Sequence, residues 1–253
     1  LLNLNEALKE IAEYKKIDFK EIAETYDKVS KKFSGHVKWS NLSANEWNQM
    51  QINQENIQNV MEFYKKTPNY IFELMEYHST KGKQSLSKTV IDFCKKNNLK
   101  NILDFGAGVC QDSIIASKNN LNSTAADIPG KTFDFGKWRI EKYNLKIKTI
   151  NIFDENPIKE NYDAITCFEV LQHVVNPEKT LSHLIKHLNI QGILFITTRF
   201  KNNYSLALKH NEHLEDTFEE MVKKSNLIIE EKIHMWGEGD SSKFLYLLKN
   251  NKN

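Results

Sequence analysis

Apolar side chains recur at helical spacing through the first hundred residues of the chain. Asp18 and Glu21 form a capping-box pattern, and Ser43 and Glu46 repeat it. Pro68 suits the first turn of a further helix. The apolar positions that these helices would bury include Ile22, Tyr26, Val29, Trp47, Val60, Met61, Ile71 and Met75. The pattern therefore predicts an all-helical N-terminal segment.

After Lys100 the pattern changes to apolar strands that alternate with helical stretches. The predicted strands span residues 101–104, 123–127, 146–153, 162–168, 193–198, 227–234 and 244–249. Repeated strand–helix units predict an α/β fold with a mostly parallel seven-stranded sheet, and the last two strands, joined without a helix, predict an antiparallel C-terminal hairpin. Thr80–Lys83 is the candidate boundary, which divides the chain into a helical cap at 1–82 and a second unit at 83–253.

The composition narrows the choice of partners and compartment. The net charge is +2, with 35 Lys and Arg against 33 Asp and Glu. This balance speaks against a dedicated nucleic-acid binder, because such proteins carry a concentrated basic face. Three cysteines without a CxxC pair fit a reducing, cytoplasmic compartment. No apolar run approaches the ~20 residues of a membrane span, and no secretory leader is visible, so we expect a cytoplasmic protein.

A glycine turn follows the first predicted strand. The segment Ile102–Cys110 is a strand that ends in Asp104, followed by a turn that contains Gly106 and Gly108. Glycine is needed where a ligand approaches the backbone closely or where φ is positive. A dinucleotide-binding loop would require a third glycine where this chain has Gln111. A tight turn without a ligand is the alternative interpretation.

Acidic residues also end the next two predicted strands. Asp127 lies about 20 residues beyond the turn, where a carboxylate is placed to accept hydrogen bonds from ribose hydroxyls. A cap for the following helix is the alternative for this residue. Asp154 ends the third strand. Because ligands of open α/β sheets bind at the carboxyl ends of the strands, these acids and Phe168 would surround one crevice.

Several segments, in this order, resemble the motifs of class I S-adenosylmethionine-dependent methyltransferases. They are Asp-Phe-Gly-Ala-Gly at 104–108, Asp127, Asn-Ile-Phe-Asp at 151–154, Tyr-Asp-Ala-Ile-Thr-Cys-Phe-Glu-Val-Leu-Gln-His at 162–173 and Ile-Gln-Gly-Ile-Leu at 190–194. Ordered matches over roughly residues 100–250 are more specific than any one of them. The resemblance implies a Rossmann-like fold, S-adenosylmethionine as cofactor and methyl transfer as the activity. Cys110 and Gln191 depart from the family pattern, which usually has glycine at both places.

The resemblance also implies which residues hold the cofactor. They are Asp104, Gly106, Ala107, Gly108, Asp127, Ile128, Phe153, Asp154 and Phe168. The glycine turn would cradle the methionine part, and Asp104 would help to hold its amino group. Asp127 would bind the ribose hydroxyls. Asp154 would read the adenine amino group while Phe153 packs on the ring.

His173 and Glu169 are the candidate catalytic residues. His173 lies just beyond the fourth strand, where methyl group and acceptor should meet, and a histidine takes a proton near neutral pH. A packing role is the alternative, since many such enzymes need no dedicated base. Glu169 would orient the acceptor or the cofactor, or is an exposed acid at a helix start. We interpret His183 and His187, which lie opposite an apolar helix face, as solvated, and we predict no metal site.

The helical cap is expected to enclose the acceptor, because a methyl-transfer site must exclude water. The candidate acceptor or lid residues are Tyr64, Tyr70, Tyr77, His78 and His213. An ordinary helical core or a dimer contact is the alternative for the cap. We predict methyl transfer to a small molecule or a modified peptide. An RNA or protein methyltransferase, and a cofactor-binding protein without catalysis, are the alternative functions.

Overall fold

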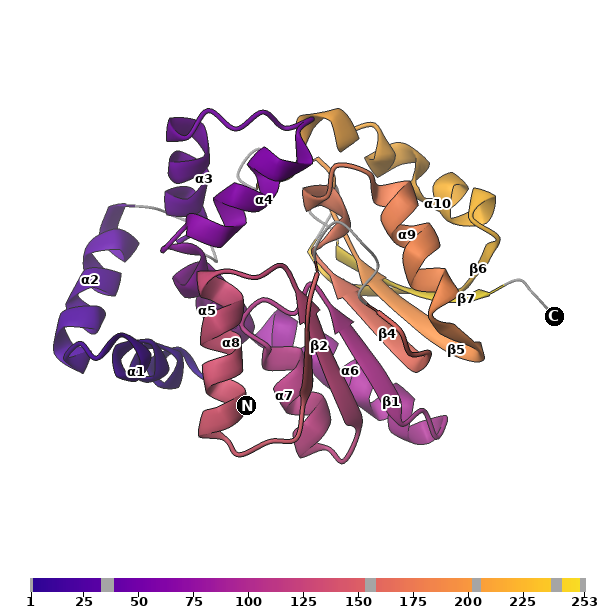
Figure 1. The fold of residues 1–253 in the computed structure, drawn as a ribbon, viewed down its shortest axis with the longest axis horizontal. Coiled ribbons are helices and arrows are strands. Elements are labelled where there is room, and N and C mark those ends of the chain that lie inside the picture. The colour runs from indigo at the N-terminus through magenta and orange to yellow at the C-terminus, as the bar shows by residue number, and fades with distance from the viewer. Residues whose placement is uncertain (1, 33–38, 153–157, 202–205, 238–242, 251–253) are drawn as a thin grey trace.

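Helices form the N-terminal part of the chain, and strands alternate with helices through the rest (Figure 1). The computed structural model describes residues 2–32, 39–152, 158–201, 206–237 and 243–250. The N-terminal helices are α1 (Leu4–Lys15), α2 (Phe19–Lys32), α3 (Ser40–Gln49), α4 (Ile57–Lys66), α5 (Tyr70–Ser79) and α6 (Lys81–Lys96). The strands are β1 (Asn101–Phe105), β2 (Asn122–Asp127), β3 (Lys148–Asn151), β4 (Tyr162–Phe168), β5 (Leu188–Thr197), β6 (Leu227–Trp236) and β7 (Lys243–Asn250). The later helices are α7 (Gln111–Lys118), α8 (Lys131–Lys142), α9 (Pro177–Lys186) and α10 (Leu214–Lys224), with 3₁₀ turns η1 (Leu171–His173) and η2 (Lys209–Asn211).

The strands form one sheet in the order β3-β2-β1-β4-β5-β7-β6. Neighbours from β3 to β5 pair in parallel, while β7 pairs antiparallel with β5 and with β6. This confirms the predicted seven-stranded, mostly parallel sheet with an antiparallel C-terminal hairpin. The chain runs outward from β1 to β3 and then returns to place β4 on the other side of β1. Such a reversal opens a crevice at the carboxyl ends of β1 and β4, where ligands of these sheets bind.

Helices cover both faces of the sheet. Apolar residues of α6 and α7 pack on one face, and α8 joins α7 in a neighbouring cluster that includes Ile114, Ala125 and Phe133. Residues of α9 and α10, among them Leu184 and Phe218, pack on the other face. Figure 1 shows α1 and α2 gathered beyond α8, with β6 and β7 at the opposite end of the molecule. Within the described residues, no helix combines the length and apolar character needed to span a bilayer.

The helix starts follow the local sequence in some places and not in others. Asn176 caps α9, since its side chain accepts a hydrogen bond from the Lys179 backbone N–H at 2.8 Å, and Pro177 begins the helix as predicted. The prediction that Ser43 caps a helix is wrong. Ser43 lies one turn inside α3 and is buried, because α3 begins at Ser40 and packs inward along its length.

Other boundaries also shift by a few residues. The third strand covers only Lys148–Asn151 rather than 146–153. Pro68 precedes α5, which begins at Tyr70. Thr80 ends α5 and caps α6, so the candidate boundary at residue 82 falls within the first turn of α6. The division of the chain at 82 and 83 therefore stays a proposal.

The helical cap has a core of its own that also touches the sheet half. Its cluster includes Ala7, Ile11 and Ile71 together with Val109 and Phe135, which come from the second unit. The rings of Trp39 and Phe72 stack with their centroids 4.3 Å apart. The cap therefore packs against the segment that follows the glycine turn and against α8.

Candidate active site

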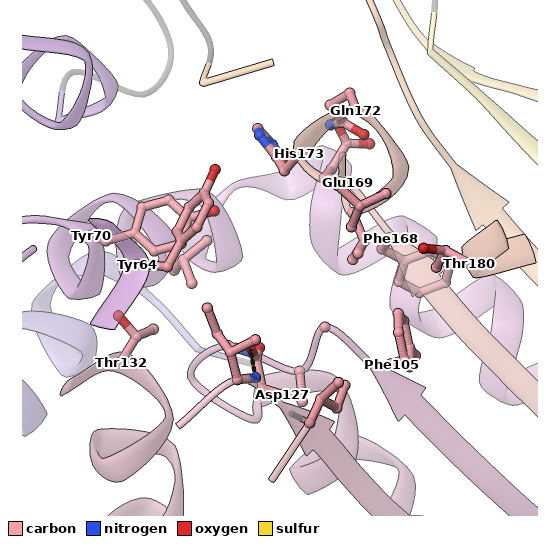
Figure 2. Close-up of a pocket in the computed structure, with 18 of the residues that line it drawn as sticks. Tyr64, Tyr70, Phe105, Asp127, Thr132, Phe168, Glu169, Gln172, His173 and Thr180 are labelled. Atoms are coloured by element: carbon pink, nitrogen blue, oxygen red, sulfur yellow. Dashed lines mark hydrogen bonds between the residues drawn. The ribbon is translucent and has the colours of Figure 1, made fainter. Parts of the chain in front are cut away.

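A cavity of about 880 Å³ lies between the cap and the carboxyl ends of the strands. The sheet side contributes residues of the glycine turn and of the ends of β1, β2 and β4. The cap contributes Val60, Met61, Tyr64, Tyr70, Leu74, Tyr77 and His78, from α4 and α5. Figure 2 shows Tyr64 and Tyr70 side by side at the edge of this space, with Asp127 and His173 on different sides of it.

The glycine turn presents bare backbone to the cavity. Gly106 and Gly108 have φ of +77° and +52°, a region that favours glycine. A Cβ on Gly106 would lie 2.2 Å from Cγ2 of Val170, and one on Gly108 would lie 2.6 Å from Cδ1 of Leu74. Cys110 also adopts the left-handed conformation, with φ of +57°, which explains why glycine is common at this place in the resembled family. Glycine is therefore required at both positions by the backbone conformation and by the close approach of Val170 and Leu74.

Asp127 is tied to the glycine turn at the end of β2. Its Oδ2 accepts a hydrogen bond from the Gly108 N–H at 2.5 Å, and its Oδ1 accepts one from the Ile128 N–H at 2.6 Å. Burial raises the pKa of this carboxyl to about 6, although both hydrogen bonds favour the charged form. Asp127 and Ile128 both line the cavity, as the predicted ribose site requires.

Asp104, at the end of β1, is almost fully buried beneath the turn. Its Oδ2 accepts hydrogen bonds from the Ser113 N–H and hydroxyl, and its Oδ1 accepts one from the Thr166 hydroxyl at 3.1 Å. Burial and the nearby Asp112 charge raise the pKa of Asp104 to about 7. The carboxyl group thus joins β1, α7 and β4 while it borders the cavity.

The structure shows a buried ion pair beside the turn that no sequence pattern predicted. Lys83 is 2% exposed, and its Nζ lies 2.5 Å from Oδ2 of Asp112. The Ser87 hydroxyl donates to the other carboxylate oxygen at 2.5 Å. The Lys83 ammonium also lies 4.4 Å from the centroid of the Phe168 ring. Lys83 looks like any surface lysine in the sequence, and only the packing of α6 on α7 brings it to the cavity.

His173 and two tyrosines meet at the cap side of the cavity. The rings of Tyr64 and His173 lie 6.1 Å apart, and those of Tyr64 and Tyr70 lie 5.3 Å apart. Tyr64 Oη and His173 Nδ1 are buried and have no hydrogen-bond partner among the described residues. Burial lowers the pKa of His173, although a hydrogen bond with the Leu206 backbone and the Glu169 charge oppose the shift, so its imidazole is neutral at neutral pH.

Glu169 is held by charge at the end of β4. Its Oε2 lies 2.6 Å from Nζ of Lys243, at the start of β7, and accepts a hydrogen bond from Gln172 at 3.2 Å. Burial alone would raise the pKa of Glu169, but the Lys243 charge and hydrogen bond bring it below its usual value. A carboxylate held in the charged form in this way suits orientation better than proton transfer. Its backbone φ of +57° is a further sign of a constrained position.

The remaining candidates divide between the cavity and the surface. Tyr77 and His78 line the cavity, and burial lowers the pKa of His78 to about 3. His213 is exposed and does not line the cavity. It lies just before α10, and its Nδ1 is 2.9 Å from the His210 carbonyl oxygen. The interpretation of His183 as solvated is wrong, since it is half-buried and lines the cavity.

Two predicted adenine contacts cannot be placed. Phe153 and Asp154 lie outside the described residues. Ile152 and Ile158, on either side of them, line the cavity. Among the described residues, no group of three or more His, Cys, Asp or Glu side chains is arranged to hold a metal ion.

Comparison with known proteins agrees with this geometry. A family model described as a methyltransferase domain matches residues 65–237, which is more than half of the chain. The chain belongs to this methyltransferase family. Its membership, together with the fold and the glycine turn, places it among the class I enzymes, which use S-adenosylmethionine as cofactor.

Curated relatives match over part of their length. The chain is 28% identical over 116 residues to a ubiquinone biosynthesis O-methyltransferase of Rickettsia akari, covering 45% of this chain and 46% of the relative. It is 29% identical over 152 residues to the protein of that name from Actinobacillus pleuropneumoniae, covering 53% and 65%. The chain thus spans about half the length of the Rickettsia relatives that it matches.

Solved structures share the fold at low sequence identity. An S-adenosylmethionine-dependent methyltransferase from Clostridium acetobutylicum superposes with a TM-score of 0.56 at 14% identity, covering 72% of this chain and 96% of that one. Magnesium protoporphyrin IX methyltransferase from Synechocystis, with bound cofactor, gives 0.57 at 14% identity, covering 79% and 98%. At this identity the likeness supports the fold alone.

Proposed function

We propose that the protein transfers a methyl group from S-adenosylmethionine to a hydroxyl group of a small-molecule acceptor, with His173 as the base. The observation that carries the proposal is the buried, unpartnered Nδ1 of a neutral His173 in the same cavity as the glycine turn. An unpartnered polar atom at this depth is disfavoured unless a ligand supplies its partner. The O-methyltransferase names of the curated relatives support the choice of a hydroxyl acceptor.

The residues around the glycine turn fit the cofactor. Gly106, Ala107 and Gly108 line the cavity where the methionine part would lie, and Asp127 is placed for its ribose hydroxyls. Lys83 and Asp112 offer one positive and one negative group beside the turn, which suits the zwitterionic amino-acid end. When bound, the cofactor supplies a methyl group already activated on a cationic sulfonium. What remains for the chain is orientation, exclusion of water and removal of one proton.

His173 performs the proton step. In the tautomer that leaves Nδ1 unprotonated, this nitrogen accepts the proton of the acceptor hydroxyl while the oxygen bonds to the methyl carbon. The bound cofactor would supply the methyl group, and its carbon–sulfur bond would break with the electron pair retained on sulfur. The lowered pKa of His173 keeps the imidazole neutral and ready before the reaction. Glu169, held by Lys243, orients the groups at the end of β4.

The cavity walls favour a small, largely apolar acceptor. Val60, Met61, Val174 and Val175 line the acceptor side together with the rings of the two tyrosines. Pockets of this kind bind apolar bodies and read a few polar groups. Tyr64 Oη offers one such polar contact. The cap thereby sets the choice of acceptor, which extends the expectation for residues 1–82.

A labelled-methyl screen tests the proposal. The purified chain is incubated with S-adenosylmethionine labelled in its methyl group and with pools of hydroxylated small molecules, short peptides and RNA. We expect the label on an oxygen of a small molecule, identified by mass, and its loss with the His173→Asn variant. Label on peptide or RNA would overturn the acceptor class. Binding of S-adenosylhomocysteine without transfer to any pool would favour a cofactor-binding protein without catalysis.

A further inference from the structure

Helix α1 reaches the glycine turn through one buried ion pair. Nε of Arg139, in α8, donates to Oε2 of Glu10, in α1, at 2.7 Å. Nη1 of the same guanidinium donates to the Val109 carbonyl oxygen at 2.6 Å, and Nη2 donates to Oε1 of Gln111. Arg139 is 1% exposed and Glu10 is 4% exposed. One side chain thus connects the first helix of the chain, α8 and the residue that directly follows Gly108.

The geometry of this pair constrains the turn. A guanidinium is a rigid, planar fork of donors, so fixing one edge fixes the direction of the others. Glu10 holds the Nε edge of Arg139, and Tyr143 holds Glu10 in turn by donating to its other carboxylate oxygen. The remaining donors therefore determine where the Val109 carbonyl points.

Helix α8 also packs directly on the turn. A Cβ on Gly136, one helical turn before Arg139, would lie 2.6 Å from Sγ of Cys110 and 2.9 Å from the Gly108 carbonyl oxygen. The left-handed Cys110 is accommodated only because α8 has glycine at this point. The turn is thus held from behind by backbone contact with α8 and by the Arg139 fork.

We propose that Glu10 and Arg139 form a positioning clamp that keeps the Gly106–Gly108 turn in the conformation that binds the cofactor. The inference rests on the proposed placement of the cofactor at this turn. Neither Glu10 nor Arg139 lines the cavity, so both act through Val109. The clamp gives the first helix of the chain a part in cofactor binding, although the sequence motifs begin only at Asp104.

The test compares two ion pairs that join the same two helices. Arg139→Lys keeps the positive charge but has no planar fork, so it cannot hold Glu10 and Val109 in one geometry. We expect about tenfold weaker S-adenosylhomocysteine binding by calorimetry, and a similarly raised KM for S-adenosylmethionine with an unchanged kcat. Lys142→Met breaks the exposed pair of Lys142 with Glu13 and leaves the turn untouched. This control variant should bind as the wild type does.

A second variant keeps the proposal testable if Arg139→Lys does not fold. Glu10→Gln preserves the shape of the side chain and removes its charge. In this variant, amide hydrogen exchange should become faster over residues 105–112 and stay unchanged over β4. A folded Arg139→Lys or Glu10→Gln variant with wild-type affinity for S-adenosylhomocysteine would overturn the clamp.

A parallel measurement separates the clamp from the site itself. Asp127→Ala removes a residue that lines the cavity. If Asp127→Ala weakens binding while Arg139→Lys does not, the clamp is wrong and the cofactor site stands. If neither variant changes the affinity, the cofactor does not bind at this turn, and both the clamp and the proposed site fail.

Discussion

The cavity has two walls that differ in how their buried polar groups are satisfied. The glycine-turn wall consists of Asp104, Gly106, Gly108 and Asp127, and its carboxylates accept hydrogen bonds from backbone N–H groups and from the hydroxyls of Ser113 and Thr166. The tyrosine wall consists of Tyr64, Tyr70 and His173. On this wall Tyr64 Oη and His173 Nδ1 are buried without a partner among the described residues.

The difference indicates which wall is complete before ligands bind. A buried donor or acceptor without a partner costs about 1–3 kcal/mol, so a ligand that supplies partners for such groups in the cavity gains affinity. Under the proposed function, the glycine-turn wall is preorganised for the cofactor, and the acceptor would complete the polar groups of the tyrosine wall.

Replacing His173 should separate chemistry from cofactor binding. We expect His173→Asn to lower kcat by about 10²–10⁴, because it removes the base, and to leave S-adenosylhomocysteine affinity unchanged. Steady-state kinetics on the acceptor found in the screen, with calorimetry on the same preparation, measures both. A kcat within a few-fold of the wild type would show that the tyrosine wall carries no base.

Replacing Asp127 should have the opposite signature. Asp127→Ala is expected to weaken S-adenosylhomocysteine binding by about 10- to 100-fold, because hydrogen bonds to a charged group contribute on the order of 1.5–3 kcal/mol. Asp134→Ala is the matched control, since Asp134 is an exposed acid of α8 that does not line the cavity. Equal affinities for the two variants would remove Asp127 from the ribose site.

The glycine-turn wall should also make cofactor binding depend on pH. The folded-state pKa of Asp127 is about 6, above its ordinary 3.8, so the free protein holds this proton more tightly than the unfolded chain does. This residue therefore lowers the free energy of unfolding as pH rises from about 4 to about 6. Binding to ribose hydroxyls requires the charged form, so affinity should fall about tenfold per unit below pH 6.

Asp127→Asn provides the control for this pH dependence. Asp104 and Glu73, whose pKa values burial raises to about 7, titrate in the same range. The contribution of Asp127 is consequently the difference between wild type and Asp127→Asn, measured by calorimetry from pH 5 to 8. Parallel pH profiles for the two proteins would assign the titration to the other carboxyl groups.

The smallest effect is expected from removing a tyrosine hydroxyl, and the same change at two positions should give opposite results for stability. Tyr64→Phe removes a hydroxyl without a partner, so the free energy of unfolding should stay the same or rise, while the KM for the acceptor increases. Tyr143→Phe removes a hydroxyl that donates to Glu10, and should lower the free energy of unfolding by about 1 kcal/mol. Chemical denaturation measures both variants. A loss of stability in Tyr64→Phe would mean that its hydroxyl is already satisfied in the free protein.

Local sequence patterns were enough to predict the sheet half of the molecule. Strand periodicity predicted the strands and the hairpin, and the acids at strand ends predicted the glycine-turn wall. These features are local, because a strand alternates over a few residues and a tight turn needs glycine at fixed places. The start of α9, with Asn176 as its N-cap residue, is predictable for the same reason. The placement of His173 beside the cavity also follows from its position just beyond β4.

The rest of the site depends on how the helices pack against one another. Lys83 reaches Asp112 because α6 packs on α7, and Glu10 reaches Arg139 across 129 residues because α1 packs beside α8. His213, though placed near the acceptor by sequence order, faces the surface. Helix periodicity shows which face of a helix is buried but not what that face meets. Such contacts depend on how whole elements pack, and no local pattern records them.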